Sequence, residues 1–446
     1  MKHSFILNLT RVTLGCSLSL LLGACAGSQL AIGVPATATA DARSAWTLHS
    51  IYTFMGGRDG ESPVSGVVAL HAKDYPQIIG TTTQGGYYLA GTVYGLIKSG
   101  KAWKEQLLYQ FGGADGWEPM GIAVPKSLNE ATPVFVTSFR GGSHGGGTFI
   151  ALQANSSGTW TGLSSYSFGG KRDGSGPMGP VIEDASGNLY GTTCCGGAHG
   201  LGTVYRVQHT TSGYIERAIY SFKGGRDGDY PRGGLIDING VLYGTTEYGG
   251  AEGSLGTIFK LTPSGSGFTE SIVYAFSGVP DGVHPYSGLC LGPDGAFYGT
   301  TLEGGTNKDG TVFKLFHSSS GRTGYSERVV WSFGGFIGDG TNPWGPVIVD
   351  KAGVIYGTTV SFRVYSGTSD GTFFTLTPKG RHYKEKLYDF DGYNGSGPES
   401  GPTADGEGNV YMPTYGGGPQ FSGAVAEAKG AVGGTNCDPG SVTESE

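Results

Sequence analysis

Two adjacent cysteines, Cys194 and Cys195, stand in the glycine-rich stretch LYGTTCCGGAHG, and His199 follows four residues later. Three chemistries are open to them: a vicinal disulfide, which would be a strained ring; zinc binding together with His199 and His144; or simple thiols and a structural disulfide. The spacing lacks the CxxC and HxxxH patterns that are typical of zinc sites, so no metal is expected. We expect simple thiols or a structural disulfide.

The stretch that carries the cysteines recurs along the chain with other residues inside it. Residues 242–261 (LYGTTEYGGAEGSLGTIFKL) and 297–315 (FYGTTLEGGTNKDGTVFKL) keep the frame and lose the cysteines and the histidine. The frame is therefore structural, and functional residues are expected where it varies, chiefly at the two positions after each Thr-Thr. The candidate ligand contacts are Gln84, Arg140, Cys194, Cys195, Glu247, Tyr248, Glu303, Arg363 and Tyr415.

The elements that position these residues follow from the period of the repeat. The Gly-Thr or Gly-Ala step that opens each GTVFKL-like run occurs seven times, with spacings of 56, 55, 54, 54, 61 and 52 residues, at Gly91, Gly147, Gly202, Gly256, Gly310, Gly371 and Gly423. Each unit contains four short apolar runs bounded by turn signals. In the fourth unit the predicted strands are residues 233–238, 241–246, 256–262 and 269–276. Such units predict the blades of an all-β propeller.

The two ends of the repeat region complement each other. Residues 45–54 match the fourth strand of a unit with nothing ahead of it, and the seventh unit has only three strands, near 400–404, 409–414 and 423–428. The opening strand is therefore expected to complete the last blade and to close a ring of seven four-stranded blades, which leaves no unpaired edge. The prediction is a seven-bladed β-propeller over residues 45–428, followed by a flexible tail at 429–446.

In a four-stranded meander the loop after the second strand and the crossover after the fourth strand share one face. Propeller ligands usually meet this loop face. The crossovers place equivalent polar residues there in every unit: Asp59, Asp115, Asp173, Asp227, Asp281, Asp339 and Asn394. We expect each to hydrogen-bond its own turn. A ring of calcium sites is the alternative, which single Asp residues disfavour because calcium requires several oxygen ligands.

The two repeated motifs, YSFxGGxDGxxP and LYGTTxxGGxxxxGTVFKLT, resemble the glycine- and valine-rich GloVer tandem repeats of bacterial exported proteins with varied anchors. The resemblance covers about residues 45–428. Unit two departs most, with PVFVTSFRGG at 133–142, and unit six carries the insert VSFRVYSGTSD. The resemblance implies export and a repeat fold, and it implies no particular activity.

The first 24 residues resemble a bacterial lipoprotein signal peptide. Lys2 and Arg11 accompany the apolar stretch VTLGCSLSLLLGA, which is too short to span a bilayer as a mature helix. It ends in LGAC, which resembles a lipobox and implies lipidation of Cys25; Ala26 implies sorting to the outer membrane. Residues 25–44 are then a small, polar tether. An ordinary signal peptide cut elsewhere is the alternative.

Composition and motifs together narrow the function. The chain has 29 basic and 36 acidic residues and no basic stripe, so a nucleic-acid partner is not expected. No acid–base constellation is evident, so we expect no catalytic residue and no cofactor. The leading interpretation is a non-catalytic cell-envelope module, bound to the membrane only by its lipid, that recognises a glycan, peptide or protein on the loop face.

Two other functions remain open at this point. The first is an exported lyase or hydrolase in which Glu247 and Glu303 work with Arg140 at the mouth of the propeller, which requires the two carboxylates to converge. The second is a purely structural envelope protein, which predicts no concave pocket.

Overall fold

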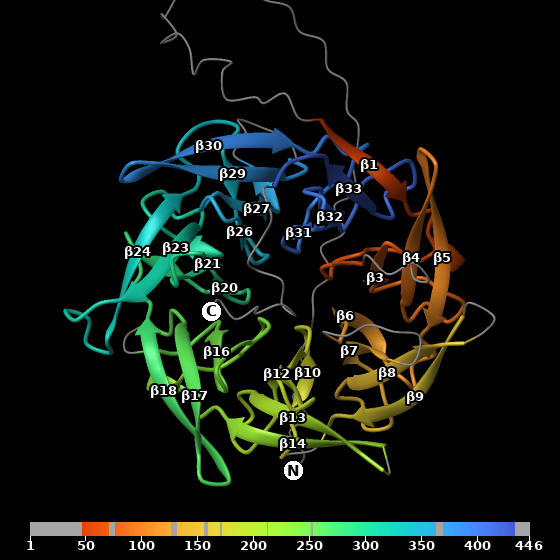
Figure 1. Ribbon diagram of the computed structural model, residues 1–446, viewed down its shortest axis with the longest axis horizontal. Coiled ribbons are helices and arrows are strands. Elements are labelled where there is room, and N and C mark those ends of the chain that lie inside the picture. Colours follow the sequence, from red (N-terminus) through yellow and green to blue (C-terminus); the bar gives the residue numbers. More distant parts are fainter. Residues whose placement is uncertain are drawn as a thin grey trace, which may run out of the picture. The chain divides into compact units, whose positions relative to one another are not determined.

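The computed structural model describes residues 47–70, 76–125, 132–155, 159–169, 172–211, 213–250, 253–362 and 369–432. They form a ring of seven antiparallel blades within the compact unit Asp41–Glu446, each with its first strand toward the centre and its fourth at the rim (Figure 1). The predicted seven-bladed β-propeller is thereby confirmed.

The strands of blades 1 to 3 run outward from the centre in chain order. Blade 1 contains β2 (Val68–Ala69), β3 (Ile78–Thr82), β4 (Thr92–Ser99) and β5 (Ala102–Gln110). Blade 2 contains β6 (Trp117–Ala123), β7 (Val134–Arg140), β8 (Thr148–Ala154) and β9 (Trp160–Ser167). Blade 3 contains β10 (Ser175–Pro177), β11 (Ile182–Glu183), β12 (Leu189–Cys195), β13 (Thr203–Thr210) and β14 (Gly213–Ser221).

Blades 4 to 6 repeat this order. Blade 4 contains β15 (Ile236–Ile238), β16 (Val241–Thr246), β17 (Thr257–Ser264) and β18 (Gly267–Ala275). Blade 5 contains β19 (Gly282–Val283), β20 (Cys290–Leu291), β21 (Phe297–Thr301), β22 (Glu303–Gly304), β23 (Thr311–His317) and β24 (Tyr325–Ser332). Blade 6 contains β25 (Gly340–Thr341), β26 (Ile348–Val349), β27 (Ile355–Thr359), β28 (Ser361–Phe362), β29 (Thr372–Lys379) and β30 (His382–Asp389).

Blade 7 is built from both ends of the repeat region. It contains β31 (Thr403–Ala404), β32 (Val410–Thr414), β33 (Ala424–Ala428) and the opening strand β1 (Leu48–Thr53). β1 pairs antiparallel with β33, and the Phe54 amide donates to the Gly423 carbonyl at 2.9 Å. The predicted closure of the ring is therefore confirmed over residues 48–54. Two 3-10 turns, η1 (Gly57–Asp59) and η2 (Gly225–Asp227), lie in crossovers.

The core lies between blades, where aromatic side chains interlock. The phenylalanine that ends each fourth strand is at most 2% exposed: Phe54, Phe111, Phe168, Phe222, Phe276, Phe333 and Phe390. Phe222 of blade 3 packs against Phe259 of blade 4 with ring centroids 5.0 Å apart. Burial of one such ring stabilises the fold by about 1.5–3 kcal/mol. The same kind of contact joins Phe54 to Tyr94, Phe168 to Tyr205, Phe276 to Phe313 and Phe333 to Phe374, so this phenylalanine packs most blades against the next.

A glycine and a proline also meet at each boundary between blades. Gly256 has φ +99°, and a Cβ there would lie 2.3 Å from Cδ of Pro285 in the next blade. At the closing boundary a Cβ on Gly423 would lie 2.4 Å from Cδ of Pro63. The Gly-Thr step thus needs glycine both for its backbone conformation and for the neighbouring blade.

The loop face is assembled as the sequence predicts. The crossovers pair directly with the loops that follow the second strands, as in the bridges between Glu61 and Gln84 and between Asp229 and Tyr248. Beneath these loops a threonine hydroxyl caps the turn: Thr246 hydrogen-bonds the hydroxyl of Thr257 and the carbonyl of Tyr248. The variable residues after Thr-Thr therefore stand on a rigid base.

Candidate functional site

The crossover aspartates hold the loops together. The Tyr274 hydroxyl donates to Asp281 at 2.9 Å, and the backbone amide of Ser277 donates to the same carboxylate at 2.8 Å. Asp59 accepts equivalent bonds from Tyr52 and from the amide of Met55. These bonds are those of a structural turn. In the described part of the chain no group of three or more His, Cys, Asp or Glu side chains is placed to hold a metal ion.

The side chains that form the candidate site come mainly from a second variable position, the residue after the proline of each crossover. Each crossover ends in a proline, which cannot donate a ladder hydrogen bond. In blades 3, 5 and 6 the innermost strand is interrupted near this proline, between β10 and β11, β19 and β20, and β25 and β26. In blade 2 the strand β6 runs through Pro119 with an irregular register. The residue after the proline varies between blades, with methionine in two of them, and we call the seven positions the proline-adjacent ring: Val64, Met120, Met178, Arg232, Tyr286, Trp344 and Glu399.

Four members of this ring touch one another across three blade boundaries. Arg232 Nη1 donates to the Tyr286 hydroxyl at 2.8 Å and lies 3.3 Å from Met178 Sδ. The rings of Tyr286 and Trp344 have centroids 5.2 Å apart. Blades 3 to 6 therefore join in one continuous surface near the centre of the propeller, at the loop-face end of the innermost strands.

Arg232 is the centre of this surface. Its Nε donates to Oε2 of Glu247, and the two side chains are 20% and 6% exposed. Its guanidinium carbon lies 4.7 Å from the ring centroid of Tyr286 and 5.5 Å from that of Tyr230. A planar guanidinium placed over aromatic rings while it pairs with a carboxylate is held in one orientation. No described group accepts a hydrogen bond from its Nη2.

Tyrosine and histidine side chains extend the surface along the loop face. Tyr248 makes edge contacts with Tyr230 at 5.8 Å and with His284 at 5.0 Å. Hydrogen bonding to Glu247, followed by burial, raises the pKa of Tyr248 to about 12. These hydroxyls therefore stay protonated and able to donate at neutral pH.

Glu399 adds a titratable group to the proline-adjacent ring. Burial raises its pKa to about 7. Burial also raises the pKa of Tyr286, with smaller upward contributions from Glu247 and Glu399 against the opposing effect of Arg232. The site thus combines a carboxylate paired with a guanidinium and a second carboxyl group that is partly protonated near neutrality.

The two cysteines lie at the edge of this cluster. Their Sγ atoms are 2.8 Å apart, and both are free. Cys194 is buried, whereas Cys195 is partly exposed. Cys290, in contrast, is disulfide-bonded.

The structure brings together four of the nine predicted contacts, namely Cys194, Cys195, Glu247 and Tyr248. Gln84 is exposed and pairs through its backbone with Glu61, and Glu303 is exposed in β22. Arg140 is exposed, 3.5 Å from Glu118, and Tyr415 is also exposed. Among the described residues no contact joins Glu247 to Glu303. Arg363 and Cys25 lie outside the described residues.

The sequence patterns did not lead to five residues of the site: Met178, Arg232, Tyr286, Trp344 and Glu399. A signal was present in the same repeats, because the position after the crossover proline varies, with methionine in two units and a different residue in each of the other five. What the pattern could not reveal is that these residues meet.

A rim of exposed apolar side chains lies along part of the loop face. Most large apolar side chains that are exposed in the described ranges lie in loops of this face: Met55, Tyr87, Tyr88, Leu89, Trp117, Val279, Phe336, Ile337, Tyr393, Tyr415 and Phe421. A cavity of about 290 Å³ lies among them, lined by Arg58, Tyr87, Tyr88 and Gln110. Apolar surface of this kind is typical of a face that binds a partner or ligand.

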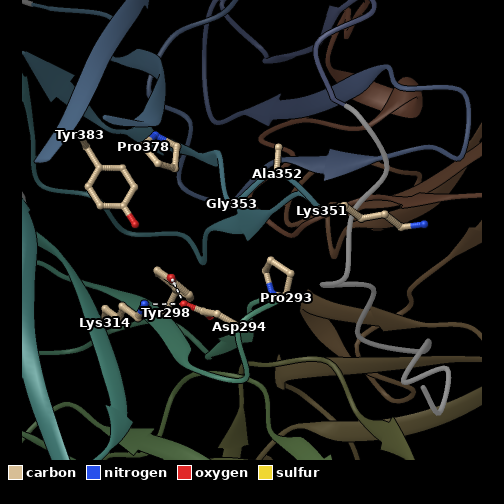
Figure 2. Close-up of a pocket in the computed structure, with 9 residues that line it drawn as sticks. All are labelled: Pro293, Asp294, Tyr298, Lys314, Lys351, Ala352, Gly353, Pro378 and Tyr383. Atoms are coloured by element: carbon tan, nitrogen blue, oxygen red, sulfur yellow. Dashed lines mark hydrogen bonds and ion pairs between the residues drawn. The ribbon is translucent and has the colours of Figure 1, made fainter. Parts of the chain in front are cut away.

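A cavity of about 320 Å³ opens on the opposite face, between blades 5 and 6 (Figure 2). Two of its three charged groups are paired with each other: Lys314 contacts the Asp294 carboxylate, to which the Tyr298 hydroxyl also donates at 3.0 Å, whereas Lys351 is exposed. Both interactions appear as dashed lines in Figure 2, with Pro378 and Tyr383 across the gap. Because Asp294, Lys314 and Tyr298 satisfy one another, this cavity is a weaker candidate than the proline-adjacent ring.

The fold and this site define a seven-bladed propeller with an asymmetric central surface. Residues 77–279 and 255–436 match the Gloeobacter/Verrucomicrobia repeat, and the chain belongs to that family. The resemblance drawn from the two motifs is confirmed to this extent. No curated protein matches the sequence significantly.

Solved structures of similar shape show the propeller fold and no more. A proposed 6-phosphogluconolactonase from Bacteroides uniformis superimposes with a TM-score of 0.51 and 14% identity, covering 80% of this chain and 97% of that one. A proposed selenium-binding protein from Sulfolobus tokodaii gives a TM-score of 0.53 and 9% identity, covering 81% and 89%. At such identities the likeness carries no activity to this chain.

Within the described ranges, no helix has the length and apolar character needed to cross a bilayer.

Proposed function

We propose that the protein is a binding module that takes a neutral sugar unit of a cell-envelope glycan on the surface formed by Arg232, Tyr286 and Trp344. The contact chain from Met178 through these three residues carries the proposal. This chain joins side chains of four successive blades, each of a different residue type.

The chemistry of the surface suits a sugar. Aromatic rings such as those of Trp344 and Tyr286 offer flat apolar faces with polar edges, which match the alternating C–H and hydroxyl faces of a pyranose. Glu247 neutralises Arg232, so the surface offers fixed hydrogen-bonding groups without a strong net charge. A few oriented polar groups on an aromatic wall are the usual composition of a small-ligand site.

The apolar rim supports a large partner around this unit. Tyr393 and Phe421 are 81% and 79% exposed on the loop face, and Leu89 is 65% exposed. A polymer or protein that covers these side chains would add contact area beyond a single sugar. We therefore propose that the sugar is part of a longer glycan.

Binding is tested by applying the purified chain to a glycan array and titrating each positive sugar by calorimetry. Trp344→Ala and Tyr286→Phe are expected to weaken binding. Trp103→Ala and Tyr383→Phe are matched controls that change the same residue types near the opposite face. An array without a positive sugar, or affinity unchanged by Trp344→Ala, would contradict the proposal, and a structural role would then explain the fold better.

We also propose that the chain is exported and held at the outer membrane by a lipid on Cys25. The LGAC sequence and the family's exported character in the motif resemblance support this. Palmitate labelling of cells that express the chain, with Cys25→Ser as the control, tests it. Equal label in both chains, or label in neither, would be evidence against the anchor.

A second candidate function is glycoside hydrolysis at the same surface. The observation that favours it is that burial raises the pKa of Glu399, a member of the proline-adjacent ring, to about 7, while Glu247 pairs with another member, Arg232. A carboxyl that is protonated near neutrality can serve as a general acid. Release of reducing sugar from a bound glycan, abolished in Glu399→Gln with binding retained, would favour this function over binding alone.

A further inference from the structure

Cys194 and Cys195 occupy an unusual position for consecutive residues of a strand. Both belong to β12, where successive side chains normally point to opposite faces of the sheet. Their Sγ atoms are nevertheless 2.8 Å apart, and neither is bonded to another cysteine. A disulfide bond is about 2.05 Å long, so the two sulfurs need to close by only about 0.8 Å to form one.

The environments of the two sulfurs differ. Cys194 is 2% exposed, and its Sγ packs beside Gly176, where a Cβ would lie 2.7 Å from the sulfur. A side chain in place of Gly176 would also meet the ring of Phe139 at 2.9 Å, so the Cys194 pocket is closed by these two residues. Cys195 is partly exposed and lies near Tyr230 and Arg232. One sulfur is therefore accessible and the other is held directly behind it.

The protonation of the pair follows this asymmetry. Hydrogen bonding from Cys194, opposed by burial and helped by Tyr230 and Arg232, lowers the pKa of Cys195 to about 6. Hydrogen bonding to Cys195, followed by burial, raises the pKa of Cys194 well above its ordinary value. At neutral pH Cys195 is accordingly the thiolate and Cys194 the thiol.

We propose that Cys194 and Cys195 form a redox-active dithiol that exchanges with an external disulfide, with Cys195 as the nucleophile and Cys194 as the resolving thiol. The exposure of one sulfur, the burial of the other and their 2.8 Å separation carry the proposal. It does not depend on the proposed sugar binding.

The exchange takes place in two steps. The Cys195 thiolate attacks one sulfur of a disulfide R–S–S–R′, which forms the mixed disulfide Cys195–S–S–R and releases R′–S⁻. The released thiolate takes the proton of Cys194, and the Cys194 sulfur attacks the Cys195 sulfur and releases R–S⁻. Two electrons thus pass from the dithiol to the external disulfide, which ends as one thiol, R′–SH, and one thiolate, R–S⁻. The product is a strained ring of adjacent cysteines, which is more easily reduced than an ordinary disulfide.

The first test uses the unchanged protein, so no substitution can disturb folding. The reduced full chain is exposed briefly to iodoacetamide between pH 5 and 9, and labelling is located by peptide mass spectrometry. Cys195 is expected to react first, with a midpoint near pH 6, while Cys194 stays unlabelled. Labelling of Cys194 first, or of both only above about pH 8, the range of an ordinary thiol, would overturn the proposal.

The second test uses oxidised glutathione as the external disulfide. The wild type is expected to lose two hydrogens within the Cys194–Cys195 peptide and to retain no glutathione. Cys194→Ser should retain one glutathione on Cys195, formed at least about tenfold faster at pH 7 than the adduct of Cys195→Ser. Circular dichroism confirms that each variant is folded. Equal rates in the two variants, or glutathione retained by the wild type, would refute the assignment.

Tyr230→Phe tests the positioning role of the Tyr230 hydroxyl. Removal of this donor is expected to move the pH midpoint of Cys195 labelling upward with the fold unchanged. A midpoint equal to that of the wild type would show that Tyr230 does not stabilise the thiolate, and the role would fall to Cys194 and Arg232.

Discussion

The Nη1 atom of Arg232 donates a hydrogen bond to the hydroxyl of Tyr286, 2.8 Å away, across the boundary between blades 4 and 5. The two residues occupy the same position in successive repeats, 54 residues apart in sequence. Equivalent positions of two neighbouring repeats thus carry different side chains, one a hydrogen-bond donor and the other its acceptor. The candidate site depends on this hydrogen bond between neighbouring blades.

Removal of either partner of the Arg232–Glu247 pair should destabilise the protein. Arg232→Met leaves the Glu247 carboxylate buried without its positively charged partner, which costs about 3–5 kcal/mol. The double variant Arg232→Met/Glu247→Leu should recover much of this loss because no charge remains buried. Urea unfolding of both single variants and the double variant measures the coupling. Additive losses would show that the pair is not coupled.

The aromatic members of the proline-adjacent ring should control affinity for the glycan. Trp344→Ala is expected to weaken binding at least about tenfold, since it removes a stacking face. Tyr286→Phe keeps the ring and removes the hydroxyl that accepts from Arg232, so a smaller loss of about 0.5–1.5 kcal/mol is expected. Calorimetric titration measures both. A larger effect of Tyr286→Phe than of Trp344→Ala would assign recognition to the hydroxyl instead of the aromatic faces.

Closure of the ring should be sensitive to a single methyl group at Gly423. This residue has φ +101°, and an alanine Cβ would lie 2.4 Å from Pro63, so Gly423→Ala should cost roughly 3 kcal/mol. Gly430 also has a positive φ, +64°, but nothing lies within 4 Å of the Cβ position. Gly430→Ala therefore isolates the backbone strain, about 1 kcal/mol. Equal shifts of the two urea midpoints would mean that the Pro63 contact is not tight.

Stability should fall as the pH rises from about 5 to 9. Burial raises the pKa of one carboxyl on the fourth strand of several blades, to about 7 for Glu105, about 8 for Glu216, Glu270 and Glu327, and about 9 for Glu385. The ordinary value in the unfolded chain is 4.5, so in this range the folded state holds protons that the unfolded state has released. The stabilisation is complete below about pH 4.5 and is lost as the pH passes the folded values.

Glu385→Gln provides the matched control for this pH dependence. The amide cannot ionise, so the variant should be more stable than the wild type at pH 9 and similar to it at pH 5. Urea unfolding at intervals of one pH unit measures both curves. Parallel curves for the two proteins would show that Glu385 does not contribute.

Much of the fold follows from the sequence because the same pattern, four short apolar runs bounded by turn residues, occurs in seven units. The second strand of unit four was predicted at 241–246 and is β16, Val241–Thr246. The first strand was predicted at 233–238 but β15 begins at Ile236, because the backbone of Gly233 passes against the neighbouring blade and leaves the ladder. The periodicity of the sequence predicts strands and turns, but it does not show where the backbones of neighbouring blades come into close contact.

The candidate site could be predicted only in part. The two positions after Thr-Thr led to Cys194, Cys195, Glu247 and Tyr248, which the structure places together with Arg232 and Tyr230. The pairing of Glu247 with Glu303 that an enzyme would need has no counterpart in the contacts of the described residues. Arg232 takes that place beside Glu247. Its position varies between repeats, but the sequence pattern does not show that it meets Glu247.

The amino-acid sequence determined the number of blades, the closing strand and the face that carries the variable loops, since each of these depends on patterns within a few residues or on the count of repeats. Only the tertiary structure decided which variable side chains meet. Met178, Arg232, Tyr286 and Trp344 are separated by more than fifty residues at each step. They come into contact because the blades pack side by side and bring equivalent positions of neighbouring repeats to one centre.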